Sequence, residues 1–262
     1  MPKAAPALSI IVPTRNEAAN IQPLLARLED ALRDIAAEVL LIDDSDDATP
    51  EIARQAAVHS ALPIRVHARA PGQREGGLGG AVLLGLTEAF GLFCVVMDAD
   101  LQHPPELLGR LLRASSAGAD FVIASRYIDG GAEEGLNGWH RRAVSTMATW
   151  VAKCLLRPEL AGISDPMSGF FGVRRSCLDM SSLHPRGFKL LLELLVHNPG
   201  ASVTEVPYTF ACRHSGVSKA GMREGLTYLS RLAELSARAR RAPKRPRRQL
   251  VPEAQGPDPG AR

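Results

Sequence analysis

Short apolar runs and segments with helical spacing alternate along the first half of the chain. The apolar runs have the length of buried strands, and they cover residues 8–12, 38–42, 64–67, 93–97 and 121–124. The predicted helices cover residues 17–35, a segment that starts at Thr49 and Pro50, 78–90 and 105–115. This alternation predicts an α/β fold over residues 1–126, with a mostly parallel central sheet and helices on both faces.

The second half departs from this alternation. We expect a glycine-rich loop over 127–138, strands over 168–173 and 203–210, and helices over 140–156, 187–197 and 222–239. Prolines and arginines dominate after residue 242, a composition typical of disorder. The sequence therefore predicts a disordered N-terminus over residues 1–7, one α/β domain over 8–240 and a basic, Pro/Arg-rich disordered tail over 241–262.

Charge is unevenly distributed along the 262 residues. Residues 238–262 hold eight basic and two acidic residues, whereas the rest of the chain is slightly acidic. Two interpretations of this tail stay open: solvated disorder, or attraction to an anionic membrane surface, worth about 1 kcal/mol per basic residue. Nucleic-acid binding is not expected, because no aromatic or recognition element accompanies the arginines.

Cysteine usage and hydropathy favour a reducing, cytoplasmic location. The four cysteines are scattered, without a C-x-x-C pair, at Cys94, Cys154, Cys177 and Cys212. Residues 1–7 lack the apolar core of a signal peptide, and no apolar run approaches the length of a transmembrane helix. Met147 and Trp150 lie on an apolar stripe of the 140–156 helix, for which core packing is favoured over a membrane-facing role.

Polar residues follow four of the predicted strands. They occupy residues 13–17, 43–47, 98–100 and 125–127. The carboxyl ends of parallel strands meet at one edge of a sheet, so these residues are expected to line one crevice. Asp98 and Asp100 offer the oxygen ligands that Mg²⁺ prefers, and Mg²⁺ retains waters and substrate phosphates in its shell. A solvated loop is the alternative for an isolated Asp-x-Asp.

Seven motifs resemble those of the family-2 glycosyltransferases with the GT-A fold, and among them the polyprenyl (dolichol) phosphate mannosyltransferases. They follow family order over about residues 8–235. The motifs are IVPTRNE at 11–17, LIDDS at 41–45, GLGGA at 77–81, MDADLQHPP at 97–105, SRY at 125–127, SGFF at 168–171 and RHSGVSK at 213–219. The aspartate motif with its LQHPP extension and the R-x-x-G-x-S-K motif are the most specific of them.

The resemblance implies a role for each matched residue. Those that would frame the donor nucleotide are Pro13, Arg15, Glu17 and Asp44. Those that would hold Mg²⁺ or Mn²⁺ and the donor diphosphate are Asp98, Asp100 and Gln102. Those that would hold the acceptor phosphate are Arg126, Arg141 and Ser145, and those on a loop that closes over the donor diphosphate are Arg213, Ser218 and Lys219. The implied catalytic residues are Asp100, Arg126 and Arg213.

Two departures from the family pattern bear on the substrates. The glycine that often follows the second strand in the family is missing from Asp43 to Thr49, which affects base recognition. Members that act on hydroxyl acceptors often carry Glu-Asp as a base, and the nearest match here is Ser164–Asp165. This fits a lipid monophosphate, whose second pKa near ~6 leaves it ionised without a strong base. Asp165 is then structural or lines the acceptor site.

The implied activity is inverting transfer of a sugar, mannose from GDP-mannose, to a polyprenyl (dolichyl) monophosphate. Two alternatives stay open: transfer from UDP-glucose or another UDP-sugar to undecaprenyl phosphate, and a non-catalytic nucleotide-sugar-binding regulator. A dinucleotide-dependent oxidoreductase is disfavoured, because Gly77, Gly79 and Gly80 follow a polar loop rather than a strand. The implied partners are the nucleotide-sugar donor, the lipid acceptor, a membrane surface in peripheral contact and a membrane partner subunit.

Overall fold

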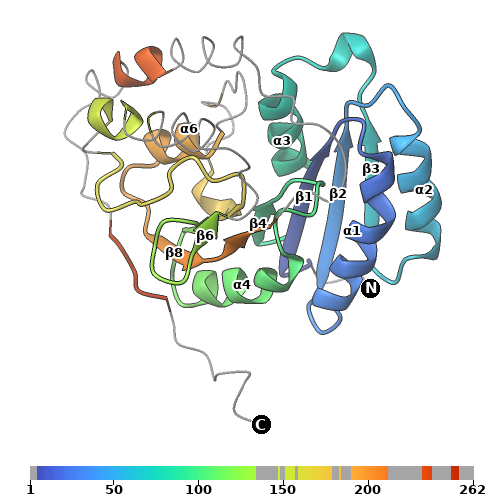
Figure 1. Ribbon diagram of the computed structural model, residues 1–262, viewed down its shortest axis with the longest axis horizontal. Helices are drawn as coiled ribbons and strands as arrows, with labels where there is room; N and C mark the ends of the chain where they lie inside the picture. The colour runs from blue at the N-terminus through green and yellow to red at the C-terminus, as the bar shows by residue number, and fades with distance from the viewer. Residues whose placement is uncertain are drawn as a thin grey trace.

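A seven-stranded sheet forms the centre of the computed structural model, which describes residues 5–133, 147, 151–156, 159–178, 183, 190–211, 232–237 and 249–253 (Figure 1). The strand order is β3-β2-β1-β4-β7-β5-β8. The strands are β1 (Leu8–Thr14), β2 (Ala37–Asp43), β3 (Ile64–Ala68), β4 (Phe93–Val96), β5 (Phe121–Ser125), β7 (Phe171–Arg174) and β8 (Val203–Pro207). Neighbouring strands are parallel except beside β7, which runs antiparallel between β4 and β5. The predicted, mostly parallel sheet is confirmed.

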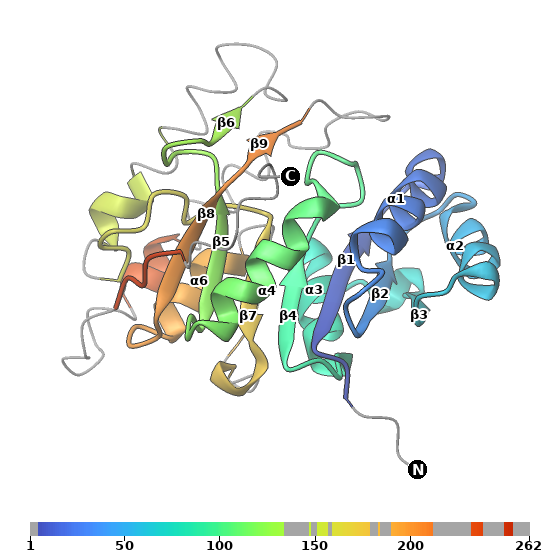
Figure 2. The same ribbon diagram turned by 90° about the horizontal axis from the view of Figure 1, so that it is seen from below.

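Helices cover both faces of the sheet (Figure 2). One face packs against α1 (Ala18–Ala31), α2 (Thr49–His59) and α4 (Leu108–Ser116), and the other against α3 (Gly77–Glu88) and α6 (Leu190–His197). The short elements are the 3₁₀ turns η1 (Pro71–Gln73), η2 (Pro105–Leu107) and η3 (Arg175–Cys177) and the paired strands β6 (Ala132–Glu133) and β9 (Thr209–Phe210).

The central strand β1 shows why the strands are continuous apolar runs in the sequence. Ile10 and Val12 are fully buried in the core that contains α1, whereas Ile11 is fully buried in the core that contains α3. Successive side chains of a strand point to opposite faces, and both faces are covered here. If polar and apolar residues alternated along this strand, the polar side chains would lie in one of the two cores.

Several element boundaries differ from those predicted, and α1, for example, ends at Ala31 rather than at residue 35. Thr49 is the first residue of α2 rather than its N-cap, and its hydroxyl accepts a hydrogen bond from the N–H of Glu17. The strand predicted over 168–173 begins only at Phe171. The strand predicted over 203–210 divides at Tyr208 into β8 and β9, because β9 leaves the main sheet to pair with β6.

Residues 249–253 lie along the outer edge of β8, which differs from the disorder expected across 241–262. The N–H of Val203 donates to the carbonyl of Gln249, and the N–H of Val251 donates to the carbonyl of Val203, each at 2.9 Å. Glu253 also forms an ion pair with Arg110 of α4 at 3.0 Å. The segment therefore covers part of an otherwise open sheet edge. No helix in the described part of the chain is long and apolar enough to cross a bilayer.

Gly85 allows α3 to approach β1 closely. A Cβ at this position would lie 2.4 Å from Cγ2 of Ile11, closer than two such atoms can approach. We expect Gly85→Ala to lower the free energy of unfolding by about 1–3 kcal/mol, because overpacking outweighs the gain of ~1 kcal/mol in helix propensity. Urea denaturation measures the change.

Gly109→Ala in α4 is the matched control for that substitution. A Cβ at Gly109 would lie 3.6 Å from Nη1 of Arg113, an ordinary contact. This variant is expected to gain stability by about 0.5 kcal/mol from helix propensity alone. Equal stabilities of the two variants would contradict the close packing of α3 on β1.

Candidate active site

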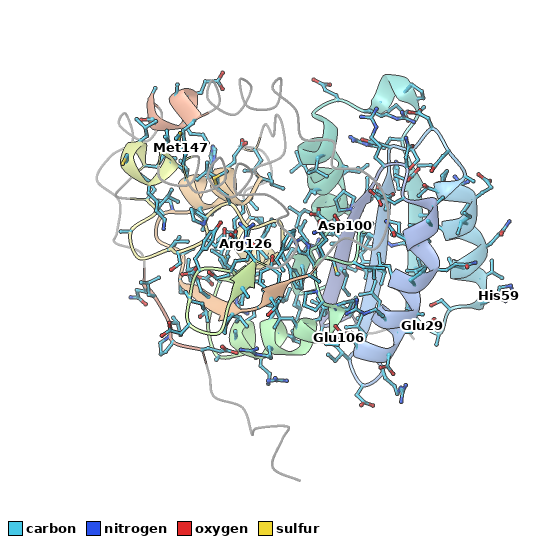
Figure 3. The ribbon with its side chains drawn as sticks, in the orientation of Figure 1. Glu29, His59, Asp100, Glu106, Arg126 and Met147 are labelled. Atoms are coloured by element: carbon cyan, nitrogen blue, oxygen red, sulfur yellow. The ribbon has the colours of Figure 1, made fainter. Side chains whose placement is uncertain are left out.

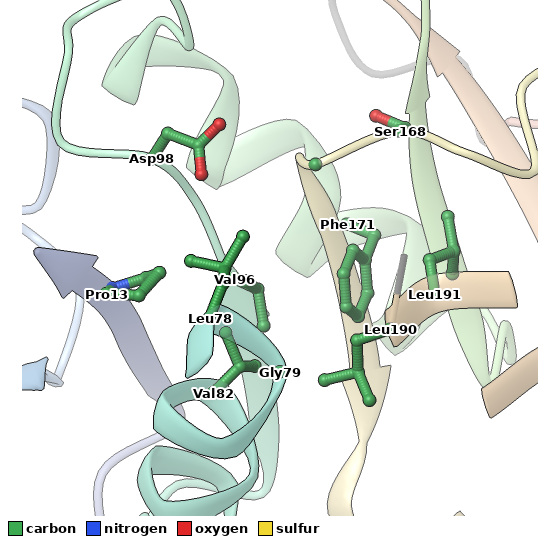
Figure 4. Close-up of a pocket in the computed structure, with 11 residues that line it drawn as sticks. Pro13, Leu78, Gly79, Val82, Val96, Asp98, Ser168, Phe171, Leu190 and Leu191 are labelled. Atoms are coloured by element: carbon green, nitrogen blue, oxygen red, sulfur yellow. The ribbon is translucent and has the colours of Figure 1, made fainter. Parts of the chain in front are cut away.

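The carboxyl ends of β1, β2, β4 and β5 meet at one edge of the sheet, since these strands run parallel. The chain moves outward from β1 through β2 and β3, and then continues on the other side of β1 with β4. Such a reversal of strand order is where open α/β sheets bind ligands. A pocket opens here, lined from several elements by Pro13, Leu78, Asp98, Ser168 and Leu190, among others. In Figure 4, Asp98 and Ser168 lie at its upper end above apolar side chains.

The loops after β1 and β2 are joined by hydrogen bonds. Thr14 Oγ1 and Ser45 Oγ both donate to Oδ2 of Asp43 at 2.6 Å, and the N–H of Asn16 donates to Ser45 Oγ at 2.7 Å. Asn16 has a φ of 53°, a left-handed conformation that asparagine tolerates better than most residues. These contacts fix the backbone beside Pro13, so Asp43 has a structural role.

Asp44 is held by a partner that the sequence did not indicate. Nε of Arg69 donates to Oδ1 of Asp44 at 2.7 Å and Nη2 donates to Oδ2 at 2.5 Å, and both side chains are buried. The same guanidinium also donates to the carbonyls of Glu75 and Gly77, at 3.2 and 2.9 Å. The pair therefore joins the end of β2 to the start of α3, and Asp44 lies within this network at the edge of the crevice.

Asp98, Asp100 and Gln102 lie on one tight turn after β4. Asp100 and Gln102 are buried, and Oδ1 of Asp100 accepts the N–H of Gln102 at 3.1 Å. Between them Leu101 has a φ of 64°, which is unusual for a branched residue and marks a constrained backbone. The Asp98 side chain is 43% exposed and lines the pocket.

This turn fits a divalent cation that is shared with a diphosphate. Among the residues that the structure describes, no three His, Cys, Asp or Glu side chains gather as a complete metal site. Mg²⁺ and its relatives do not need one, because one or two carboxylates suffice where substrate phosphates and waters complete the shell. Two carboxylates and an amide on one constrained turn provide hard oxygen donors of the required kind.

Arg126, directly after β5, is held by a buried carboxylate. Its Nε and Nη2 donate to the two oxygens of Asp165 at 2.7 and 2.9 Å, and the Asp165 side chain is fully buried. Asp165 is fixed in turn, because its N–H and that of Ser164 donate to the carboxylate of Glu205 on β8 at 2.9 and 2.8 Å. Both oxygens of Asp165 are therefore occupied in orienting Arg126.

Aromatic rings flank the Arg126 guanidinium. Its central carbon lies 5.1 Å from the ring centre of Tyr127 and 5.7 Å from that of Phe210. Burial on its own would lower the pKa of Arg126, but the hydrogen bonds and charge of Asp165 outweigh burial and raise it. Arg126 is thus a permanent cation with fixed geometry. In Figure 3, Asp100 and Arg126 both occupy the middle of the molecule, and His59 lies at its periphery.

The remaining predicted residues divide into two groups. Arg15 is exposed at the crevice edge, and Glu17 accepts a hydrogen bond from Nδ2 of Asn20 at 2.6 Å. Five predicted residues lie outside the described part of the chain: Arg141, Ser145, Arg213, Ser218 and Lys219. The last described residue before three of them, Ala211, is paired with Gln102 by two hydrogen bonds, one from the Ala211 N–H at 3.1 Å and one from Gln102 Nε2 at 2.9 Å.

Comparison with known families assigns the chain. Residues 9–180 match the profile of the family described as Glycosyl transferase family 2. The chain belongs to glycosyltransferase family 2. The turn after β4 lies within the matched residues, as do the residues that line the pocket apart from Leu190 and Leu191.

Relatives of this family-2 glycosyltransferase are more than a third identical to it over the aligned residues. It is 39% identical to the dolichol-phosphate mannosyltransferase of Pyrococcus furiosus over 231 residues. This alignment covers 87% of this chain and 63% of that protein. It is 37% identical to the enzyme of the same name from Saccharomyces cerevisiae, over 87% of this chain and 86% of the relative. It is 36% identical to the polyprenol monophosphomannose synthase of Mycolicibacterium smegmatis, over 88% and 87%.

Solved structures show the GT-A fold for this family-2 chain. Glucosyl-3-phosphoglycerate synthase from Mycobacterium tuberculosis, in complex with Mn²⁺, UDP and phosphoglyceric acid, superposes with a TM-score of 0.66 at 20% identity, over 92% of this chain and 81% of that one. The same enzyme with Mg²⁺ and UDP gives 0.66 at 21% identity, over 92% and 82%. The GT-A fold implied by the sequence motifs is confirmed.

Sequence reasoning did not single out two residues of the site. His103 lies within the motif MDADLQHPP, where it precedes two prolines. Its part in the site is visible only in the structure, from its burial and its hydrogen bond with Asp98. Arg69 is the first residue of a polar loop, where an arginine is usually solvated. Neither had a sequence signal beyond its proximity to a motif.

Proposed function

We propose that this enzyme transfers mannose, with inversion, from GDP-mannose to a polyprenyl (dolichyl) monophosphate. The names of its family-2 relatives support both the sugar and the class of acceptor. The pocket at the switch point supplies the place for the donor, with the Asp98–Gln102 turn at one end of it.

The observation that carries the proposal is the state of Asp165. This is the carboxylate nearest in sequence to the base of relatives that deprotonate a hydroxyl acceptor, yet it is fully buried and both of its oxygens are bound by Arg126. It is therefore unsuited to accept a proton from a substrate. A phosphate acceptor avoids this requirement, because it is already ionised near neutral pH.

The reaction then depends on positioning and on charge. A non-bridging oxygen of the lipid phosphate attacks C1 of the mannose from the side opposite the diphosphate, the C1–O bond to the diphosphate breaks, and GDP leaves with the electron pair. Arg126 holds the acceptor phosphate, with Arg141 and Ser145 as its proposed partners. Fixed arginines suit phosphate oxygens, and correct placement of the nucleophile accounts for much of the barrier reduction.

The residues proposed to bind the nucleotide-sugar donor follow the other strands. We propose that Pro13, Arg15 and Glu17 frame the nucleotide beside Asp44, which Arg69 fixes in place. Arg213, Ser218 and Lys219 bind the donor diphosphate. Asp98, Asp100 and Gln102 would hold Mg²⁺ or Mn²⁺, which would neutralise charge on the departing diphosphate when bound. Structures of a fold neighbour with Mn²⁺ or Mg²⁺ support this choice of ions.

The acceptor's lipid tail suggests where the enzyme works. We propose that it acts at the cytoplasmic surface of a membrane, in peripheral contact with it and with a membrane partner subunit. The excess of basic residues over 238–262 supports attraction to anionic lipid. The catalytic domain in this proposal covers residues 8–240.

Transfer of radiolabelled sugar into an organic-extractable lipid tests the proposal. Purified protein is incubated with polyprenyl phosphate and Mg²⁺ or Mn²⁺, with labelled GDP-mannose or UDP-glucose in parallel reactions. We expect label from GDP-mannose only, abolished by a chelator and released by mild acid, because the product is a glycosyl phosphate.

The other outcomes separate the alternatives. Label from UDP-glucose alone would make the enzyme a UDP-sugar transferase acting on undecaprenyl phosphate or a similar lipid. Nucleotide-sugar binding with no transfer from either donor would support a non-catalytic regulator.

A further inference from the structure

We propose that His103 is a positioning residue that holds the turn from Asp98 to Gln102 in its metal-binding shape. The inference rests on the proposed function, because it assumes that the Asp98 and Asp100 carboxylates hold the cation. His103 has no carboxylate and does not contact the donor in this proposal, so it would act only through the turn that it holds.

The imidazole closes the turn by a hydrogen bond across five residues. The N–H of Asp98 donates to Nδ1 of His103 at 3.0 Å. Because Nδ1 is an acceptor, the proton of the neutral ring is on Nε2, which lies 4.0 Å from Oδ2 of the Asp98 carboxylate. Both the main chain and the side chain of Asp98 therefore face this one ring.

Burial shields this hydrogen bond from solvent. His103 is only 2% exposed, so the contact between the Asp98 N–H and Nδ1 lies inside the protein.

Packing fixes the plane of the ring. It stacks on Phe170 with ring centres 5.1 Å apart and an angle of 19° between planes. The ring centres of Tyr208 and Phe210 lie 6.0 and 5.7 Å from its own. A Cβ at Gly169 would lie 3.3 Å from both Cε1 of His103 and Oδ2 of Asp98. The absence of a side chain at Gly169 thus lets the ring and the carboxylate lie this close together.

The turn needs such a support because its own backbone is constrained. Leu101 has a left-handed φ of 64°, and conformations of this kind persist only where the surroundings impose them. The Asp98 side chain is 43% exposed and lines the pocket, and the His103 ring lies against it. Loss of the acceptor would leave the Asp98 N–H unsatisfied and free the turn to relax away from its metal-binding shape.

Two substitutions separate the hydrogen bond from the packing. Phenylalanine at His103 keeps an aromatic ring against Phe170 but has no acceptor, whereas the Oδ1 of asparagine can replace the Nδ1 acceptor but loses the ring. The probe is Mn²⁺ with GDP, followed by the loss of the free-Mn²⁺ electron paramagnetic resonance signal. Thermal unfolding is recorded on the same samples.

His103→Phe is expected to weaken Mn²⁺ binding about 10–100-fold, the usual effect of removing a residue that orients a metal ligand. His103→Asn is expected to recover binding to within about threefold of the native protein, while unfolding at a lower temperature than His103→Phe. His59→Phe, the same change at an exposed residue of α2, is the matched control and is expected to bind Mn²⁺ like the native protein.

Native Mn²⁺ affinity in His103→Phe would overturn the proposal, as would equal losses in the two His103 variants. Failure of the native protein to bind Mn²⁺ with GDP would instead overturn the proposed metal site, and with it the proposed function. The native titration, made first, therefore separates the two failures.

Discussion

Asp100→Ala is expected to lower mannosyl transfer about 10³-fold or more while the protein stays folded. A divalent ion that binds the diphosphate supplies several kcal/mol of charge stabilisation, and each 1.36 kcal/mol corresponds to about tenfold in rate. Asp100 also accepts the N–H of Gln102, so its loss removes both a proposed metal ligand and a hydrogen bond that shapes the turn. Initial rates with GDP-mannose and polyprenyl phosphate measure the effect.

Asp30→Ala is the control for this prediction. Asp30 is an exposed carboxylate near the end of α1, paired at 2.5 Å with Arg33, which follows the helix. Exposed pairs of this kind contribute little, so native rates within about twofold are expected. Mn²⁺ binding should be lost in Asp100→Ala and kept in Asp30→Ala. Transfer by Asp100→Ala at the native rate would show that the turn after β4 is not the metal site.

The fold was predictable from the sequence wherever both faces of a strand are buried. In β1, Ile10, Ile11 and Val12 form an uninterrupted apolar run because they fill two different cores. The direction of β7 was not predictable in this way. An apolar strand carries the same pattern in either direction, and only its pairing with β4 and β5 shows that it is antiparallel.

The candidate site was predictable where its residues are consecutive and follow a strand. Asp98 and Asp100 are examples, because the position of a strand end in a parallel sheet is fixed by the topology. The partners of site residues were not predictable. Asp44 and Arg69 are 25 residues apart, and Arg126 and Asp165 are 39 residues apart, with no shared periodicity to connect them.

Because its partners cannot be read from the sequence, Asp165 had three possible roles there. A carboxylate near a substrate motif is equally consistent with a base, a lining residue and a structural anion. Its chemistry is decided by exposure and by what occupies its two oxygens. The structure shows a buried carboxylate with Arg126 on both oxygens, which excludes the first of these roles.

Asp165→Asn is therefore expected to impair stability and transfer together. It removes the carboxylate that binds two nitrogens of a buried guanidinium and leaves that of Glu133, 3.7 Å away, as the more distant counter-charge. Breaking a buried ion pair from one side costs about 3 kcal/mol of unfolding free energy. Arg126 would also lose its fixed orientation toward the acceptor, and a misplacement of about 1 Å costs on the order of 10²-fold in rate. Urea denaturation and initial rates at varied polyprenyl phosphate measure the two effects.

The control for stability is Glu51→Gln, which breaks the exposed Glu51–Arg54 pair of α2, 3.1 Å long, and is expected to change the unfolding free energy by less than about 0.5 kcal/mol. The double variant Arg126→Met/Asp165→Leu separates the effect on stability from the effect on transfer. Apolar residues of similar volume can replace a buried ion pair with little loss of stability, so this variant is expected to fold at least as well as Asp165→Asn. It lacks the cation for the acceptor phosphate and should remain inactive. Recovery of transfer in the double variant would show that Arg126 and Asp165 are only a structural pair, because no charge would then remain at this position to bind the acceptor.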